Sequence, residues 1–208
     1  IGFCLVGSEM CIRDSNQTGN GNLSMGAFTG RRLTSGSGNT FLGGSAGRYV
    51  TSGAVNVFVG QFAGYCATSG CENTAVGCGA GRAATSAIHN TSIGRAAGFS
   101  NGTGHGNVAV GHSAGFGNRG SNNISIGATA GTADSCTNTY DNIFIGRCTG
   151  TSRTSGCFNI VMGFRSGSAN HTGNGVGSYN ISFGHLSGHN LTTASNTISI
   201  GCRAGRAT

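Results

Sequence analysis

Apolar and polar residues alternate along this chain in short bursts, and each burst ends at a glycine. In NTAVGCGAG, residues 73–81, a β-branched residue stands on either side of one middle residue, and asparagine comes first. Alternation with a period of two is typical of a short β-strand, and glycine permits the tight corner that would follow it. The pattern therefore predicts three-residue strands separated by turns.

The burst recurs along nearly the whole chain at an almost constant spacing. Its first glycine falls at 26, 43, 60, 77, 94, 111, 127, 146, 163, 184 and 201, so the usual step is 17 residues, with single steps of 16, 19 and 21. We number each unit from its asparagine: positions 2 to 4 are the strand, positions 5 and 9 are glycine, and position 8 is Ala, Ser or Thr. A disordered Gly-rich chain would not keep such a phase. The repeat predicts a regular fold.

A 17-residue unit is too short for two helices and a turn, but it fits one coil of a β-solenoid whose strands stack about 4.8 Å apart. Composition agrees, because 41 glycines, no proline and no tryptophan suit a thin core of small and β-branched side chains. We expect an all-β fold: a single elongated β-solenoid (β-helix or β-roll) of about eleven 17-residue coils, spanning residues 16–208.

Two features of the unit have predicted structural roles. Buried asparagine amides in phase would form a ladder between coils; the alternative is N-glycosylation, because N-x-S/T motifs occur at Asn22, Asn90, Asn123 and Asn180. Glycines in phase would permit the corners. The ladder residues are Asn22, Asn39, Asn56, Asn73, Asn90, Asn107, Asn123, Asn142, Asn159 and Asn180, and the clearest corner glycines are Gly26, Gly30, Gly43, Gly47, Gly60, Gly64, Gly77 and Gly81.

The direction of the middle strand residue, position 3, stays open. It is never charged and is often apolar, as at Phe41, Phe58 and Phe144. If it faces outward, it forms a stripe able to pack against another chain. If it faces inward, it belongs to the core of its own chain.

Catalytic chemistry has few residues available. After residue 15 the acidic residues are Glu72, Asp134 and Asp141, which are too few for a convincing paired-carboxylate site. Asp134 and Asp141 flank the enlarged 19-residue step and are weak candidates for a cation site, with a solvated loop as the alternative. We expect no enzyme and no cofactor.

The formal net charge is +7, and all twelve basic residues are arginine. Arg31, Arg48, Arg82 and Arg206 share one phase, immediately after the second glycine. The same phase contains Tyr65, Phe99, Phe116 and His189, so the stripe combines arginine with aromatic residues. A stripe of this kind is a candidate site for surface glycans or other anionic polymers, with a solvated edge as the alternative. No basic run is longer than two residues, so no specific nucleic-acid partner is expected. No apolar stretch approaches 18 residues, so no transmembrane segment is expected.

Cysteines in phase suggest two disulfides. Cys136 and Cys157 would lie side by side on adjacent coils, and Cys66 and Cys71 would close a small loop. Such bonds suit an exported protein. The alternative is that these residues are free thiols.

Thr34, Thr51, Thr68 and Thr85 also share a phase and would stack as a rank. Ice-binding solenoids present flat ranks of threonine, so an ice-facing rank is an alternative function. An outward pair needs alternate residues, however, and here serine follows threonine directly, as in a turn.

Units such as GNTFLGGSAG, ENTAVGCGAG and HNTSIGRAAG resemble the NTAxGYxA-type repeats of large bacterial surface proteins and phage tail-fibre-like proteins. They are also similar in style to the head repeats of trimeric autotransporter adhesins. The resemblance covers residues 22–205 and implies a non-enzymatic structural or adhesive fibre module, located outside the cell, on its surface or on a virion. Self-association into trimers or end-to-end filaments is the partner that it implies.

The first fifteen residues lack the rhythm of the rest. LVGSEMCIRDS, residues 5–15, resembles the translated end of a transposase-type sequencing-library adapter. Residues 1–15 are therefore expected to be non-native and to pack poorly onto the first coil. Residues 16–208 would then be either a fragment of a longer chain or a subunit that stacks.

Overall fold

The computed structural model describes residues 18–132, 139–151, 155–168, 177–190 and 193–205. Its regular elements are eleven three-residue strands in one parallel sheet, and the predicted all-β solenoid is confirmed. The strands are β1 Leu23–Met25, β2 Thr40–Leu42, β3 Val57–Val59, β4 Thr74–Val76, β5 Thr91–Ile93, β6 Val108–Val110, β7 Ile124–Ile126, β8 Ile143–Ile145, β9 Ile160–Met162, β10 Ile181–Phe183 and β11 Ile198–Ile200.

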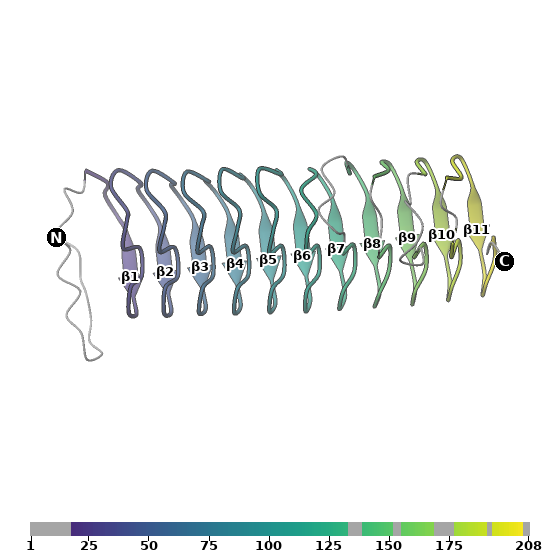
Figure 1. The fold of residues 1–208 in the computed structure, drawn as a ribbon, viewed down its shortest axis with the longest axis horizontal. Coiled ribbons are helices and arrows are strands. Elements are labelled where there is room, and N and C mark those ends of the chain that lie inside the picture. The colour runs from purple at the N-terminus through teal and green to yellow at the C-terminus, as the bar shows by residue number, and fades with distance from the viewer. Residues whose placement is uncertain (1–17, 133–138, 152–154, 169–176, 191–192, 206–208) are drawn as a thin grey trace.

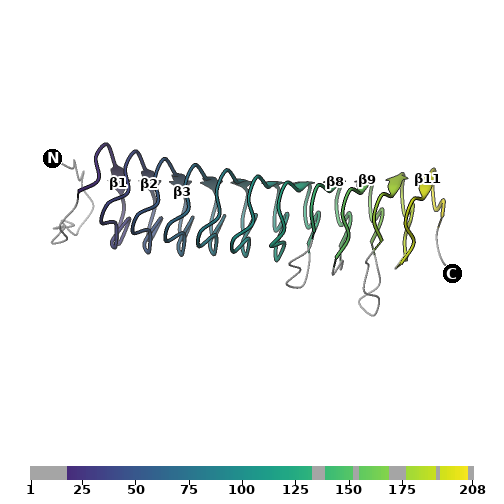
Figure 2. The same ribbon diagram turned by 90° about the horizontal axis from the view of Figure 1, so that it is seen from above.

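The strands lie in chain order, so each coil contacts only the coil before it and the coil after it (Figure 1). The register keeps each position of the unit opposite the same position of the next; Leu23, for example, pairs with Thr40. Bonds between coils continue outside the sheet, as from Gly47 N to Ala63 O at 2.9 Å and from Tyr49 N to Tyr65 O at 3.0 Å. This repetition produces an elongated body with the sheet along one side (Figure 2). We call the coil that begins before strand βn coil n.

The irregular steps in the sequence do not disturb the sheet. The step of 19 residues still places Ile124 opposite Ile143, and the step of 21 still places Ile160 opposite Ile181. Insertions into the turns are therefore absorbed without a change of register. The expected boundary at residue 15 lies outside the described residues.

The middle strand residue faces inward, which answers the open question about position 3. Phe41, Phe58 and Val161 are at most 1% exposed, and small residues at this position, such as Ala75 and Ser92, are 2% exposed. The Phe41 and Phe58 rings stack with centroids 5.4 Å apart. The stripe considered for packing against another chain is thus part of the core.

The core is thin and changes along the rod. Its largest apolar cluster runs through coils 1–4 and includes Leu33, Phe41, Val50 and Phe58. Two smaller clusters follow, around Ala109 and around Phe144. The interior between the clusters contains buried polar side chains, among them Ser92, Asn101, Asn118, Ser125 and Thr139.

Candidate functional site

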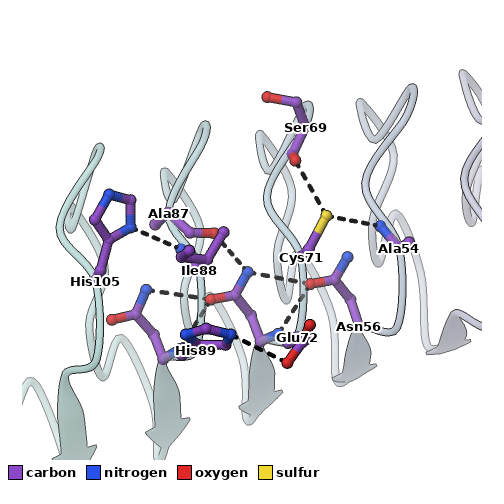
Figure 3. Close-up of polar contacts among 11 residues, drawn as sticks. Ala54, Asn56, Ser69, Cys71, Glu72, Ala87, Ile88, His89 and His105 are labelled. Atoms are coloured by element: carbon purple, nitrogen blue, oxygen red, sulfur yellow. Dashed lines mark hydrogen bonds and ion pairs between the residues drawn. The ribbon is translucent and has the colours of Figure 1, made fainter.

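The asparagines at position 1 form a hydrogen-bonded ladder through the interior. The fully buried Asn56 accepts at Oδ1 from Asn73 N (3.0 Å) and from Asn73 Nδ2 (3.1 Å). Its own Nδ2 donates to Asn39 Oδ1 at 3.0 Å and to Gly70 O at 2.8 Å. The bond to Gly70 crosses the coil, so one amide joins three coils and closes its own. Figure 3 shows Asn56 bonded to the asparagine of the next coil, whose own Nδ2 makes the equivalent cross-coil bond, to Ala87 O.

The ladder ends on a different residue. In coil 11 the asparagine position is occupied by Thr197, whose N and Oγ1 donate to Asn180 Oδ1 at 3.0 and 2.6 Å. Two asparagines of the N-x-S/T motifs make the same cross-coil bond as Asn56: Asn90 Nδ2 donates to Gly104 O and Asn123 Nδ2 donates to Thr139 O. Both residues are nearly completely buried, so this geometry supports the ladder and gives no support to glycosylation there.

The glycine corners depend on close contact between coils. Gly60 has φ +127°, and a Cβ at this residue would lie 2.7 Å from Gly77 O. Gly64 has φ +56° and lies under the Phe58 ring. Each glycine is therefore required both for its backbone conformation and for the space that its missing side chain leaves.

Two further corners were missed by the sequence reasoning. Positions 7 and 17 adopt positive φ although most of their residues are not glycine, as at Phe62 (φ 59°) and Glu72 (φ 57°). Each is held by a backbone bond to the preceding coil, from Phe62 N to Gly44 O and from Glu72 N to Ala54 O, both 3.0 Å. The available signal was weak: position 17 includes several Gly, Asn and Asp residues, which tolerate this conformation.

The threonine rank is a second hydrogen-bonded ladder between coils, formed at the surface of the solenoid by exposed and half-buried residues. The hydroxyls of Thr34, Thr51 and Thr68 donate to the backbone carbonyls of the next threonine in the rank at 2.9–3.0 Å, and that of Thr85 donates to Gly102 O. These hydroxyl hydrogens are used within the solenoid rather than offered to water. This geometry gives no support to ice binding through the rank.

Replacing Thr51 by valine keeps the shape of the side chain and removes its bond to Thr68 O. We expect the free energy of unfolding to fall by about 1 kcal/mol, the usual net value of one such bond. Urea denaturation followed by circular dichroism measures this. Ser52→Ala, at an adjacent exposed residue, is the control, and an equal loss in both variants would contradict a ladder role for the threonine.

The arginines after the second glycine interleave with aromatic rings. Arg48 lies over the rings of Phe28 (5.2 Å), Tyr49 (5.5 Å) and Tyr65 (5.9 Å), and Arg82 lies over Tyr65 (5.3 Å). Stacked coils bring position 10 next to positions 7 and 11, so Arg32, Tyr49 and the rings at position 7 join the predicted stripe of arginines and rings. We call this surface the Arg–aromatic ridge, formed by Phe28, Arg31, Arg32, Arg48, Tyr49, Phe62, Tyr65, Arg82, Phe99 and Phe116. The fourth predicted member, Arg206, lies outside the described residues.

The predicted Cys66–Cys71 bridge is not formed, and both residues are free thiols. Cys71 Sγ lies 3.5 Å from Ser69 O and 3.4 Å from Ala54 N, so it is turned toward its own turn and the preceding coil (Figure 3). Cys136, the expected partner of Cys157, lies outside the described residues.

Acidic groups are scarce on the described surface. Glu72 Oε2 pairs with His89 Nε2 at 3.1 Å, and both side chains are more than half exposed (Figure 3). Asp141 is exposed, while Asp134 lies outside the described residues. In the part of the chain that the structure describes, no three His, Cys, Asp or Glu side chains come together as a metal site would require.

One pocket of about 390 Å³ opens beside the turns of coils 5–7. Its lining is polar, with one imidazole, one guanidinium and three hydroxyl groups but no carboxylate; it consists of Gly102, Thr103, His105, Arg119, Ser121 and Tyr140. His105 Nδ1 is already engaged with Ile88 N at 3.1 Å.

The outer face of the sheet is an extended apolar surface. Because position 3 points inward, positions 2 and 4 point outward and form two parallel ranks. All of their side chains are apolar except for three threonines, Thr40, Thr74 and Thr91. Several are more than a third exposed, including Val57 at 39% and Ile93 at 41%. The sequence reasoning missed this face because it tested position 3 as the outward stripe.

Comparisons with protein-family models, with curated proteins and with solved structures find no match to this chain. The described residues contain no helix with the length and hydropathy needed to cross a bilayer.

Proposed function

We propose that this chain is a non-enzymatic structural rod that associates side by side with further copies of itself through the outer face of its sheet. The observation that carries the proposal is the pair of apolar ranks at positions 2 and 4, which contain no charged residue over eleven strands. Surfaces of this kind on soluble proteins are commonly interaction sites.

The size of the face fits this role. Eleven strands spaced about 4.8 Å apart, each about 10 Å long, give a face of about 50 Å by 10 Å. Two such faces in contact remove about 1,000 Å² from water, the size at which specific interfaces begin. The regular register of the strands keeps each rank in line from coil to coil, so the ranks of one copy can lie along the ranks of the other.

The setting that we propose is the shaft of an extracellular, cell-surface or virion fibre. The resemblance of the repeats to those of bacterial surface proteins and phage tail-fibre-like proteins supports this setting. The carbonyl and amide ladders at every coil also suit a load-bearing rod, because each coil is tied to its neighbours by backbone and asparagine bonds.

The double variant Val76→Lys with Val110→Lys places two charges on the outer face without changing the core, since both residues are at position 4 and point outward. We expect the parent chain to sediment as an oligomer and this variant to sediment as a monomer, because a buried unpaired ammonium is strongly unfavourable. Analytical ultracentrifugation measures the masses. Ser52→Lys with Gln61→Lys, at exposed positions away from the face, adds the same charge and is expected to stay oligomeric.

Electron microscopy of the same samples separates lateral from end-to-end assembly. Rods that are wider than a single solenoid support the proposal. Rods that lengthen without widening, or a parent chain that stays monomeric at the highest concentration reached, would overturn it.

A further inference from the structure

The Arg–aromatic ridge carries positive charge that nothing in the described chain neutralises. Arg31, Arg32, Arg48 and Arg82 lie within coils 1–4. Within the described ranges the one ion pair joins His89 to Glu72, and no guanidinium of the ridge donates a hydrogen bond to another described residue. Four cations on one surface without an acid are therefore held in place by something other than salt bridges.

Aromatic rings hold these guanidinium groups. Arg32 lies 4.6 Å from the centre of the Tyr49 ring, and Arg82 lies 5.2 Å from that of Phe99 and 5.3 Å from that of Tyr65. A guanidinium over a ring keeps its N–H donors directed sideways, in its own plane, where they fit carboxylate or sulfate oxygens. The rings thus orient the donors and reduce the repulsion between like charges on adjacent coils.

The ridge contains no compensating negative charge. The hydrogen bond with Tyr49 raises the pKa of Tyr65, and burial raises it further, so this phenol stays neutral at neutral pH. Glu72 belongs to position 17, a different corner of the coil, where it contacts His89. The ridge is a cationic surface with rigid donors, spaced at intervals of one coil or two coils.

We propose that the Arg–aromatic ridge of coils 1–4 binds an acidic polysaccharide, with the guanidinium groups of Arg31, Arg48 and Arg82 taking its carboxylate or sulfate groups in succession. Adjacent coils are about 4.8 Å apart, so cations recur along the rod every 5–10 Å or so, a spacing that suits a polymer with one acidic group on each sugar or on every second sugar. Hydroxyl groups of the sugars would meet the remaining N–H donors.

The geometry favours a polysaccharide over a single-stranded nucleic acid. Nucleic acids bind such surfaces by stacking bases on open aromatic faces. Here Arg32 and Arg48 both lie over Tyr49, and Phe99 is covered by Arg82 and by the Phe116 ring at 5.0 Å. The guanidinium donors of the ridge have no hydrogen-bond partner among the described residues, whereas the faces of the Tyr49 and Phe99 rings are already occupied. The site does not use the outer sheet face, so the proposal of polysaccharide binding does not depend on self-association.

The test is biolayer interferometry of the full chain on immobilised heparin and on polygalacturonate, with neutral dextran and a thymidine oligonucleotide as comparison probes. We expect binding to at least one acidic polysaccharide, weakened by salt, and no binding to dextran. Arg48→Gln with Arg82→Gln is expected to weaken the affinity about tenfold or more, because two charged hydrogen-bonding groups are lost.

Arg95→Gln with Arg119→Gln removes the same charge away from the ridge and is the matched control, with circular dichroism verifying that both variants are folded. We expect this control to bind nearly as tightly as the parent chain. An equal loss in both double variants would show a general charge effect and overturn the site. The parent chain could instead bind the oligonucleotide more tightly than either polysaccharide, and the ridge variant could lose that binding. This result would assign the ridge to nucleic acid and would also overturn the proposal.

Discussion

Replacing Asn56 by leucine is expected to lower the free energy of unfolding by about 3–5 kcal/mol, although leucine has nearly the same size. The amide serves Asn39, Gly70 and Asn73 at once. Its loss leaves the buried Asn73 N–H and the Gly70 carbonyl without these partners, and each orphaned group costs about 1–3 kcal/mol. Urea denaturation followed by far-ultraviolet circular dichroism measures the change.

The matched control is Gln61→Leu, which removes an exposed amide from the same coil. It is expected to change the stability by about 0.5 kcal/mol or less, as surface substitutions usually do. If the two variants are equally stable, the asparagine ladder does not stabilise the rod in the way that its hydrogen bonds indicate.

The position of Asn56 makes the effect larger than a local one. A solenoid is stabilised by contacts between neighbouring coils, so a defect in coil 3 weakens its contact with coils 2 and 4. The largest apolar cluster of the core runs through these coils. We therefore expect hydrogen exchange to accelerate first in coils 2–4, which separates a broken ladder from a uniform loss of stability.

The repeat allowed the fold to be predicted because its constraints act on the backbone. Asn56, Gly60 and Gly64 each have a requirement that few other residues meet: a buried amide with partners on both sides, a corner without room for a Cβ, and a left-handed turn under an aromatic ring. The two glycines recur at the same positions in all eleven units and the asparagine in ten of them, so their phase is visible in the sequence.

Which strand side chains face the core could not be predicted in the same way. Positions 2, 3 and 4 are all apolar or small, so no polar rank marks the outside of the sheet. The arrangement is decided by the opposite wall, where Gly64 leaves space for Phe58. The ridge was predicted only in part for a similar reason: Arg48 shares its phase with Arg31, but its contacts with Phe28 and Tyr49 depend on the shape of the turn.

The pairing of Phe58 with Gly64 leads to the second large expected effect. Gly64 and Gly81 have almost the same conformation, φ +56° and +55°, so alanine at either residue carries the same backbone strain of about 1–2 kcal/mol. They differ in what the new methyl group meets. At Gly64 it would overlap the Phe58 ring, whereas at Gly81 it would lie 3.2 Å from the Ala75 Cβ.

We therefore expect Gly64→Ala to cost about 3–5 kcal/mol in the free energy of unfolding, because overpacking adds to the strain. Gly81→Ala is expected to cost about 1–2 kcal/mol. Chemical denaturation of both variants gives the comparison, and equal costs would contradict the inward direction of Phe58.

A double-mutant cycle isolates the contact itself. Phe58→Ala alone is expected to cost about 3–5 kcal/mol through the cavity that it leaves. In that background the ring no longer opposes the methyl group, so Gly64→Ala should cost no more than Gly81→Ala does in the parent chain. If Gly64→Ala lowers the free energy of unfolding by the same amount with and without the Phe58 ring, the whole loss comes from backbone strain. The contact between ring and glycine would then not be what turns the position 3 side chains inward.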